Sequence, residues 1–373
     1  MKHKTMAQFK ALPPGSTIGI IGNGQLGRMT ALAAARLGYA CHVFGPDADS
    51  PAEQVAFRAT VAAYDDKDAL VEFAKSVDVV TFEFENIPHE SVQLLTKHVE
   101  VRPGWNCLQI SQDRLIEKTF INDCGIDTAP FKAVDSLADL EAAVEELGRP
   151  SILKTTRMGY DGKGQALIRP ETDLETAYDS MAGAPSVLEG FVEFQREISV
   201  IVARSACGQW TAFEPAENVH ADGILDTSSV PAHIPDGLVE EAVRIAVTLA
   251  EKMDIIGLLA VEMFHTKDDR LIVNEVAPRP HNSGHWTQDA CYSDQFEQFV
   301  RAVCGLPLGS VERRNDLVMK NLIGFDVEKW PDYLNEPNAK LHLYGKASTR
   351  RGRKMGHVNL VYPLGELLKS KKA

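Results

Sequence analysis

Several features that mark common protein classes are missing from this chain of 373 residues. No stretch reaches the roughly 20 apolar residues of a membrane-spanning helix, and residues 1–16 lack the apolar core of a signal peptide. The six cysteines form no CxxC pair, which disfavours both a zinc site and a disulfide framework. We therefore expect a cytoplasmic protein with reduced thiols and no membrane partner.

Basic charge is also in short supply. The chain has 52 acidic and 39 basic residues, which gives a formal net charge of −13 at pH 7. This excess argues against nucleic acid or an anionic membrane as the main partner, because both need a positively charged surface. A small anionic ligand would instead need a local cluster of basic side chains. The length accommodates roughly two or three domains.

The most informative segment is residues 151–169, SILKTTRMGYDGKGQALIR. Two short alternating runs flank a glycine-rich centre, a pattern that predicts two strands joined by a flexible loop. Closely spaced glycines let backbone N–H groups converge on an anion, and Lys154 and Lys163 would add positive charge. We predict a lid over a phosphate group, with its loop formed by Gly159, Tyr160, Asp161, Gly162, Lys163, Gly164 and Gln165.

Two familiar phosphate-binding loops do not fit this segment. No Lys-Ser or Lys-Thr pair follows its last glycine, as a Walker A loop requires, and the HRD and DFG motifs of protein kinases are absent. A plain glycine-rich hairpin with one solvated lysine stays open as the alternative, because short glycine motifs are common by chance.

The N-terminal region predicts a βα unit with a GxGxxG turn. Thr17–Ile21 reads as a strand, residues 22–27 as the turn, and residues 40–44 as a second strand followed by Asp47. This spacing is that of a dinucleotide fingerprint. The same turn suits any ligand that approaches a helix N-terminus, so NAD is disfavoured.

A further helix at Lys67–Lys75 precedes a strand predicted at residues 77–85. Glu83 and Glu85 would share one face at the carboxyl end of that strand, where ligands of parallel sheets bind. Two carboxylates that are merely solvated at a loop entrance are the alternative.

The middle of the chain offers groups suited to a nucleotide. A helix at residues 111–123 would carry Arg114 and Lys118 on one face. After a strand at residues 186–188, Glu189 offers an acidic group, and Gly190, Phe191 and Val192 could present backbone groups and an apolar surface to an adenine ring. An ordinary strand end is the alternative. A strand at residues 195–204 would place Glu197 and Ser199 on one face, exposed to solvent.

Two later strands, at residues 258–264 and Leu271–Ala277, carry Glu262, Asn274 and Glu275. Carboxylate and amide oxygens suit Mg²⁺ (or Mn²⁺), which takes one or two carboxylates plus substrate phosphates. As isolated acids they would instead be ion-pair partners. The polar segment 279–286 follows, and such a high density of polar side chains is more typical of a functional site than of a structural loop.

The C-terminal region predicts strands at residues 341–344 and 358–362. Between them lies a basic cluster that is out of place in an acidic protein unless it faces an anion. A solvated run of charge is the alternative. The cluster contains Lys346, Arg350, Arg351, Arg353, Lys354 and His357.

The order of these motifs resembles that of the ATP-grasp enzymes. Within them, the chain is similar from about residue 19 to residue 361 to the N5-carboxyaminoimidazole ribonucleotide synthetase family of purine biosynthesis. The motifs that carry the resemblance are GNGQLGRM, TFEFENIP, SQDR, YDGKGQ, REISVIVAR, NEVAPRPHNSGHWT, FEQFVRAVCGLPLG, NLIG, YGKAS and GRKMGHVN. It departs from the usual family residues at Asn23, Phe57, Gly190 and Arg351.

This resemblance implies an α/β (α+β) chain with an ATP-grasp fold. A Rossmann-like pre-ATP-grasp domain would occupy residues 1–108, the ATP-grasp domain residues 109–304, and a small β-rich domain residues 305–373. It also implies a cytoplasmic homodimer that uses ATP, Mg²⁺ and bicarbonate to carboxylate the exocyclic amine of 5-aminoimidazole ribonucleotide through carboxyphosphate.

The resemblance also implies a role for each matched residue. The ATP site would comprise Arg114, Lys154, the loop 159–165, Glu189–Val192, Glu197, His220, Asn274 and Glu275. Glu262 and Glu275 would be the metal ligands. The ribonucleotide would be held by Gln25, Leu26, Glu83, Asn282, Lys346, Arg353 and Lys354. The catalytic group, expected to meet bicarbonate and the amine, would be Arg279, His281 and Asn282.

Two alternatives stay open at this point. Another ATP-grasp ligase, one that transfers formyl groups or carboxylates biotin, is disfavoured by the TFEFENIP and HNSGHWT segments. A nucleotide-binding regulatory module without catalysis is disfavoured because both carboxylates, Glu262 and Glu275, are present.

Overall fold

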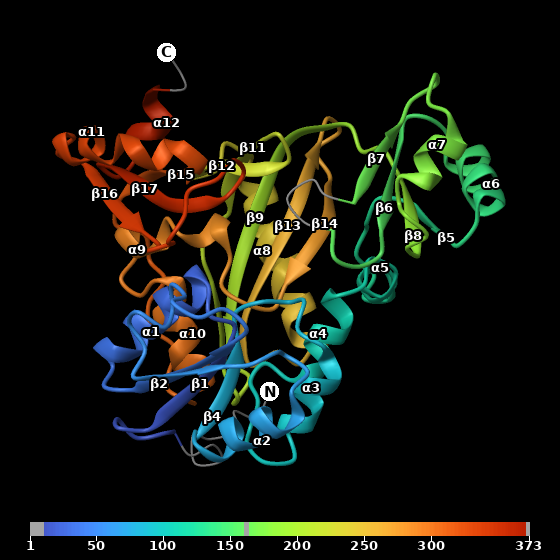
Figure 1. The fold of residues 1–373 in the computed structure, drawn as a ribbon. Helices are drawn as coiled ribbons and strands as arrows, with labels where there is room; N and C mark the ends of the chain where they lie inside the picture. The colour runs from blue at the N-terminus through green and yellow to red at the C-terminus, as the bar shows by residue number, and fades with distance from the viewer. Residues whose placement is uncertain (1–10, 160–163, 371–373) are drawn as a thin grey trace.

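The computed structural model describes residues 11–159 and 164–370. The loop residues Tyr160, Asp161, Gly162 and Lys163 lie outside the described part, so their predicted contacts with phosphate are not addressed by it. Three sheets organise the chain, and they lie in different parts of the molecule (Figure 1). Among the described helices, none is both long and apolar enough to cross a membrane.

The N-terminal sheet is parallel, with strand order β3-β2-β1-β4. The buried β-branched run TIGII forms the central strand β1, because a parallel strand covered on both faces needs apolar residues throughout. Helix α2 begins where the Asp66 carboxylate accepts a hydrogen bond from the Ala69 N–H. The elements are β1 (Thr17–Ile21), α1 (Gln25–Arg36), β2 (Ala40–Gly45), β3 (Arg58–Val61), α2 (Lys67–Lys75) and β4 (Val79–Phe82).

A linking segment of three helices joins this sheet to the rest of the chain. The helix predicted at residues 111–123 is divided, because Gln112 ends one helix and the Asp113 carboxylate caps the next by accepting from the Leu115 N–H. The three helices are α3 (His89–Leu95), α4 (Trp105–Ser111) and α5 (Arg114–Asp123).

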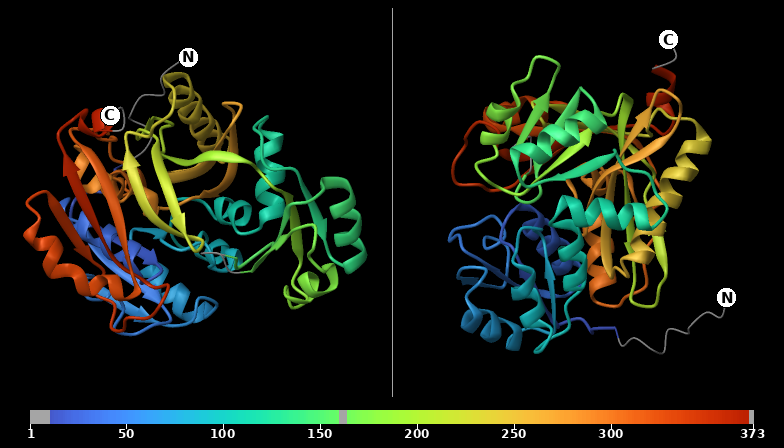
Figure 2. Two further views of the ribbon diagram at one scale, coloured as in Figure 1. Left: turned by 90° about the horizontal axis from the view of Figure 1, so that it is seen from above. Right: turned by 90° about the vertical axis from the view of Figure 1, so that its right-hand side faces the viewer.

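A separate four-stranded sheet, in the order β5-β8-β6-β7, forms the lid subdomain, residues 131–190. Its β6–β7 hairpin confirms the two strands predicted around the glycine-rich loop, and Lys154 lies opposite Gln165 in the register. Figure 2 shows this subdomain standing apart from the C-terminal strands, on the far side of the central sheet. It contains β5 (Phe131–Val134), α6 (Leu137–Leu147), β6 (Ser151–Thr155), β7 (Gln165–Ile168), α7 (Leu174–Asp179) and β8 (Ser186–Gly190).

The largest sheet has nine strands, in the order β14-β13-β9-β11-β12-β15-β17-β16, with β10 paired to β9. Three of its strands come from the C-terminal region, so the sheet continues across the predicted boundary at residues 304 and 305. The strands are β9 (Phe194–Arg204), β10 (Trp210–Ala212), β11 (Ala216–Ala221), β12 (Ile224–Val230), β13 (Gly257–Thr266), β14 (Leu271–Ala277), β15 (Asp316–Ile323), β16 (Ala339–Leu343) and β17 (Lys354–Tyr362).

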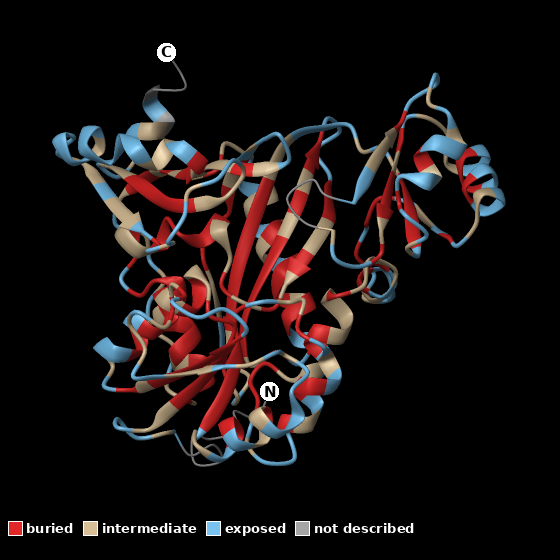
Figure 3. Cartoon of the chain, viewed as in Figure 1, coloured by how far each residue is buried: buried red, intermediate tan, exposed pale blue. Residues whose placement is uncertain are grey.

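Strand β9 crosses the centre of the molecule and is buried along most of its length (Figure 3). Ile201 packs in one core with helix α10 (Gln295–Val303), whereas Val200 and Val202 pack in another with helix α8 (Asp236–Lys252). The prediction of a solvent-exposed face on this strand is therefore wrong beyond its first residues, because helices cover both sides of the sheet.

The remaining elements are short. They are η2 (Asn282–Gly284), α9 (Thr287–Ala290), η3 (Gly324–Lys329), α11 (Trp330–Asn335) and α12 (Glu366–Ser370).

Candidate active site

A cavity of about 610 Å³ lies where the N-terminal sheet, the lid subdomain and the central sheet meet. Sixteen of the predicted site residues line it: Gln25, Leu26, Glu83, Arg114, Lys154, Gly159, Gln165, Glu197, His220, Glu262, Asn274, Glu275, Arg279, His281, Asn282 and Lys354. The topology thus gathers residues that are far apart in the sequence.

Other predicted residues lie outside this lining. Phe191 and Val192 line a second cavity of about 760 Å³. Gly164, Glu189, Gly190, Lys346 and Arg353 are absent from both linings.

The two predicted metal ligands face each other. Glu262 on β13 lies opposite Glu275 on β14 in the antiparallel register, and a bulge follows Glu262. Burial and the neighbouring Glu275 carboxylate raise the pKa of Glu262 to about 7. Two carboxylates placed side by side repel each other, so this pair fits a divalent cation. Among the described residues, no group of three or more His, Cys, Asp and Glu side chains is suited to a metal ion. Further ligands would therefore have to come from substrate oxygens or water.

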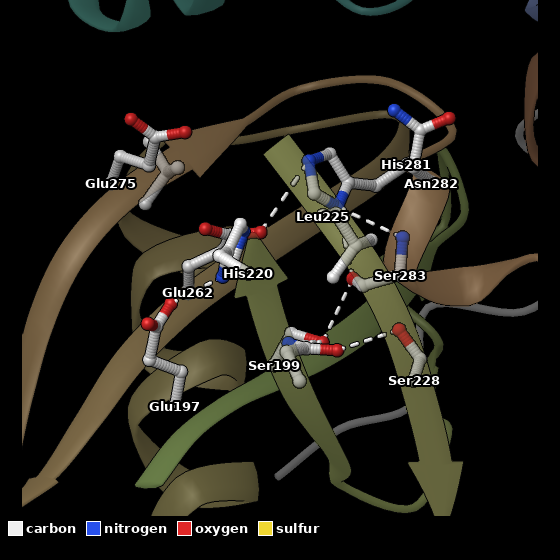
Figure 4. A network of polar contacts seen from close by, with 12 residues as sticks. Glu197, Ser199, His220, Leu225, Ser228, Glu262, Glu275, His281, Asn282 and Ser283 are labelled. Carbon is white, nitrogen blue, oxygen red and sulfur yellow. Dashed lines mark hydrogen bonds and ion pairs between the residues drawn. The ribbon is translucent and has the colours of Figure 1, made fainter. Parts of the chain in front are cut away.

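Two histidines border this carboxylate pair (Figure 4). His220 Nδ1 lies 2.6 Å from Glu197 Oε2, and His281 Nε2 lies 3.6 Å from Glu262 Oε1. Burial opposes protonation of His220, but the hydrogen bond to Glu197 and the nearby Glu262 carboxylate raise its pKa. His220 therefore gains a proton more readily than a free histidine.

His281 is held in one orientation by a chain of buried polar groups that begins on β12. Ser228 donates to Asn218, whose amide donates to Ser199 at 2.9 Å, and Ser199 donates to Ser283 at 2.8 Å. The Ser283 hydroxyl lies 2.9 Å from His281 Nδ1 (Figure 4), and the Ser283 backbone N–H also donates to that nitrogen.

A backbone N–H can only donate, so His281 Nδ1 is an acceptor and the ring proton sits on Nε2, toward Glu262. Burial and the positive charge of Arg279 lower the pKa of His281 well below its usual value. His281 is thus a neutral hydrogen-bond donor at the cavity.

A buried cluster of one carboxylate and two ammonium groups lies between the lid subdomain and α5. Glu189 Oε2 lies 2.9 Å from Lys154 Nζ and 3.3 Å from Lys118 Nζ. Burial alone would raise the pKa of Glu189, but Lys118 and Lys154 hold it below its usual value. The Glu189 side chain therefore holds two cations in place, whereas the sequence suggested it as part of an edge that binds adenine.

Arg114 connects the carboxylate pair to the lid. Its Nη1 lies 3.4 Å from Glu275 Oε2, and its Nη2 donates to the Gly159 carbonyl oxygen at 3.0 Å. A shift of the lid loop at Gly159 would therefore move Arg114 and alter its contact with Glu275.

The two glutamates predicted on one face of a strand lie beyond the end of β4, and both line the cavity. The strand ends at Phe82, and Glu83 turns back to accept hydrogen bonds from the N–H groups of Gly24 and Gly27, both at 2.6 Å. Glu85 forms a two-point ion pair with Arg279, whose Nη2 lies 2.8 Å from Glu85 Oε1. The predicted strand is wrong beyond Phe82, and each of the two carboxylates has its own partner at the cavity.

The C-terminal basic cluster is close to the N-terminal domain. Lys354, at the start of β17, lines the cavity, whereas Arg353 donates to the Ser348 carbonyl oxygen and hydroxyl, each at 2.9 Å. Burial and the positive charge of Arg353 lower the pKa of Lys346 to about 8, although the Glu83 carboxylate acts in the opposite direction. Basic side chains placed this close together are suited to bind an anion.

Sequence reasoning assigned no role to some residues that the structure brings to the site. Lys118 is fully buried and donates to the Asn274 carbonyl oxygen at 3.3 Å; its place on the face of Arg114 was the available signal. Glu117 accepts from the Val276 N–H at 2.7 Å, and burial and Glu275 raise its pKa to about 8. No local pattern pointed to Glu117.

Comparison with known protein families divides the chain into three matched segments. Residues 16–112 match the ribonucleotide synthetase preATP-grasp domain, residues 119–296 the ATP-grasp domain, and residues 318–371 the phosphoribosylaminoimidazole carboxylase C-terminal domain.

Full-length relatives are similar over nearly the whole chain. N5-carboxyaminoimidazole ribonucleotide synthase of Brucella melitensis biotype 1 is 53% identical over 355 residues, which cover 95% of this chain and 98% of the relative. The enzyme of the same name from Bacillus subtilis is 45% identical over 351 residues, which cover 93% of this chain and 92% of the relative.

Solved structures agree. An ADP complex of N5-carboxyaminoimidazole ribonucleotide synthetase superposes with a TM-score of 0.93 at 45% identity, covering 97% of this chain and 96% of that one. The Aspergillus clavatus enzyme in complex with ADP and 5-aminoimidazole ribonucleotide superposes with a TM-score of 0.90 at 29% identity, covering 96% of each chain.

Proposed function

This chain belongs to the N5-carboxyaminoimidazole ribonucleotide synthase family of ATP-grasp enzymes, and we propose on that basis how its own residues carry out the reaction. The enzyme is an ATP-dependent ligase of purine biosynthesis. It joins the carboxyl group of bicarbonate to the exocyclic amine of 5-aminoimidazole ribonucleotide and releases ADP and phosphate.

The reaction needs bicarbonate to be activated first, because bicarbonate is a resonance-stabilised anion and a poor electrophile. Transfer of the γ-phosphoryl group of ATP to a bicarbonate oxygen gives carboxyphosphate and ADP. Attack by the amine then forms the C–N bond and expels phosphate, and the amine loses a proton. Carboxyphosphate hydrolyses easily, so the site must exclude water while it holds the intermediate.

The observation that carries the assignment of the phosphoryl-transfer site is the facing pair Glu262 and Glu275, with Arg114 3.4 Å from Glu275 and Lys154 in the same cavity. The two carboxylates would hold Mg²⁺ or Mn²⁺, which would neutralise phosphate charge during the transfer. Lys154 and Arg114 supply fixed positive charge from two other elements. Glu189 restricts Lys154, so little reorganisation is needed when the phosphate arrives.

We place the adenine of ATP against an apolar wall of the cavity. Phe194 and Phe264 stack with their ring centroids 4.7 Å apart, and both line the cavity together with Ile152. The backbone of Gly190, Phe191 and Val192 would meet the polar edge of the base. Glu197 would accept from the ribose hydroxyls, and His220, which lies beside it, would face the phosphates.

Bicarbonate and the amine would meet at Arg279, His281 and Asn282. His281 presents a neutral N–H, which can stabilise a developing oxyanion without carrying a charge of its own. The 5′-phosphate of the ribonucleotide would lie at Lys346, Arg353 and Lys354, with Gln25, Leu26 and Glu83 near its other groups.

The test is phosphate release from ATP in purified protein, measured with and without 5-aminoimidazole ribonucleotide at controlled bicarbonate. Release that depends on both substrates supports the proposal, whereas release that is indifferent to both would rule it out.

We also propose that the protein is a cytoplasmic homodimer. Sedimentation equilibrium at the enzyme's working concentration tests the dimer, and a single species near the monomer mass of 41.0 kDa would contradict it.

A further inference from the structure

The peptide group of His281 is clamped by a buried glutamine on the opposite side of the loop. Gln295, in helix α10, is 0% exposed. Its Oε1 accepts from the His281 N–H at 2.9 Å, and its Nε2 donates to the His281 carbonyl oxygen at 2.8 Å. A backbone N–H only donates and a carbonyl oxygen only accepts, so these contacts determine the orientation of the Gln295 amide without ambiguity.

The orientation of Gln295 determines the tautomer of His285. The second hydrogen of Gln295 Nε2 points at His285 Nδ1, 2.9 Å away. Nδ1 must therefore accept, and in a neutral ring the proton then resides on Nε2. The ring is also prevented from turning, because it stacks on Phe296 and on His357, with centroids 5.7 Å and 4.6 Å away.

The tautomer of His285 in turn determines how Asn282 faces the cavity. His285 Nε2 lies 3.0 Å from Asn282 Oδ1, and as the protonated nitrogen it donates to that oxygen. The Asn282 amide nitrogen is left on the side of the cavity, and in Figure 4 it lies on the side of Glu275 with the oxygen on the opposite side. Asn282 thus enters the site as a hydrogen-bond donor.

We propose that Gln295 and His285 are positioning residues which, through this relay, make Asn282 a donor to the anionic carboxyl group of bicarbonate or carboxyphosphate. The inference rests on the proposed function, because it takes the bound anion from that reaction. An amide turned the other way would present an oxygen to an oxyanion, which is repulsive. The relay prevents that error before substrate binds, which is how preorganised donors stabilise charge.

The close approach of Gln295 to the loop at Gly284 supports its role in holding this loop. A Cβ atom at Gly284 would lie 2.6 Å from Gln295 Oε1 and 2.2 Å from Ile201 Cδ1. Position 284 therefore tolerates no side chain while Gln295 holds the loop. The glycine of the HNSGHW segment therefore allows Gln295 to come close to the loop.

The tautomer is tested directly by NMR of the wild-type enzyme labelled with ¹⁵N-histidine. The His285 signals are assigned as those lost in His285→Gln. We expect an unprotonated Nδ1 and a protonated Nε2 at pH 7.5. A protonated Nδ1 would overturn the proposal, whatever the activity of the enzyme.

Kinetics of two His285 variants test the consequence. Glutamine can present an N–H near the place of Nε2, whereas asparagine reaches only the place of Nδ1 and cannot donate to Asn282. We expect His285→Asn to lower kcat/KM for bicarbonate about a hundredfold, as loss of one oxyanion donor does, with the KM for ATP nearly unchanged. His285→Gln should recover at least tenfold of that loss. Equal losses in the two variants would show that His285 has only a packing role.

Gln298 provides a matched control in the same helix. It is also 0% exposed, and it holds the Gly309 peptide in the same two-point manner, with distances of 2.7 and 3.0 Å. Gln295→Met and Gln298→Met should lower the melting temperature by similar amounts, but only Gln295→Met should lower kcat/KM for bicarbonate. Similar kinetic losses in both would contradict the relay. Inactive wild-type enzyme would instead refute the proposed function, and the NMR result would still decide the tautomer.

Discussion

The carboxylate of Glu83 occupies the place at the N-terminus of α1 that a ligand phosphate would take in a dinucleotide-binding protein. It is 7% exposed and accepts from the N–H groups of Gly24 and Gly27, each at 2.6 Å. A Cβ atom at Gly22 would lie 2.4 Å from Glu83 Cγ, so the glycine of the turn admits this side chain. We predict that Glu83→Gln destabilises the protein substantially.

The magnitude follows from the two hydrogen bonds. Each bond to a charged acceptor contributes roughly 1.5–3 kcal/mol, and a buried donor left without an acceptor costs roughly 1–3 kcal/mol. Glutamine keeps one acceptor oxygen but turns an NH₂ group toward the other N–H. Burial raises the pKa of Glu83 in spite of its two partners, so removal of the charge recovers part of the loss. The expected net loss is about 2–4 kcal/mol in the free energy of unfolding.

Urea unfolding at pH 7, followed by circular dichroism, measures this loss. Asp66→Asn is the matched control, because it makes the same change at an exposed helix N-cap, where the carboxylate accepts from Ala69 N–H at 3.0 Å. It should cost about 1 kcal/mol or less. If Glu83→Gln costs no more than this control while the KM for the ribonucleotide rises, Glu83 serves the substrate and our reasoning about α1 is refuted.

Four further predictions concern the ligand sites. Glu275→Gln should lower turnover at least about a thousandfold while the circular dichroism spectrum is retained, because it removes charge that would hold a metal; near-normal phosphate release would exclude this role. NADH should not bind, since Glu83 occupies the GxGxxG turn, and enhanced nicotinamide fluorescence would contradict this. Lys346→Ala or Arg353→Ala should raise the KM for the ribonucleotide about ten- to a hundredfold and leave the KM for ATP unchanged; the reverse pattern would move these residues to the nucleotide site. Without metal, the contribution of Glu262 to stability should fall as the pH rises from 4.5 to about 7, because the folded state raises its pKa and so favours its protonated form. In EDTA, the melting temperature of the wild type relative to Glu262→Gln should therefore fall over this range, and Mg²⁺ should stabilise the wild type more at pH 8 than at pH 5.5.

Secondary structure was predictable where a local pattern determined it. The strands Thr17–Ile21 and Leu271–Ala277 and the helix Lys67–Lys75 have the predicted bounds, because each is a short apolar or amphipathic run with clear ends. Strand β15 was missed. Its sequence DLVMKNLI does not alternate, since residues of both faces are buried between β12 and β17.

Much of the cavity lining was also predictable, because the motifs carry the family resemblance. The partners within the cavity were not. Glu83 meets Gly27 across 56 positions of sequence, and Gln295 reaches His281 across 14, from a helix whose polar residues look solvent-exposed in the sequence. Such contacts depend on how whole elements pack, and no local pattern encodes them.

Three glutamates of the site differ in how their charge is compensated, and the difference supports the proposed metal site. Glu189 receives two ammonium groups, which hold its pKa below the usual value, and Glu83 receives two N–H groups, although burial still raises its pKa. Glu262 instead faces the carboxylate of Glu275, with the N–H of a neutral histidine 3.6 Å away. In sequence the three residues are equivalent acids that follow or lie within strands. Of the three, Glu262 is the one that lies opposite a second carboxylate, and we propose that a cation arriving with the nucleotide offsets this charge.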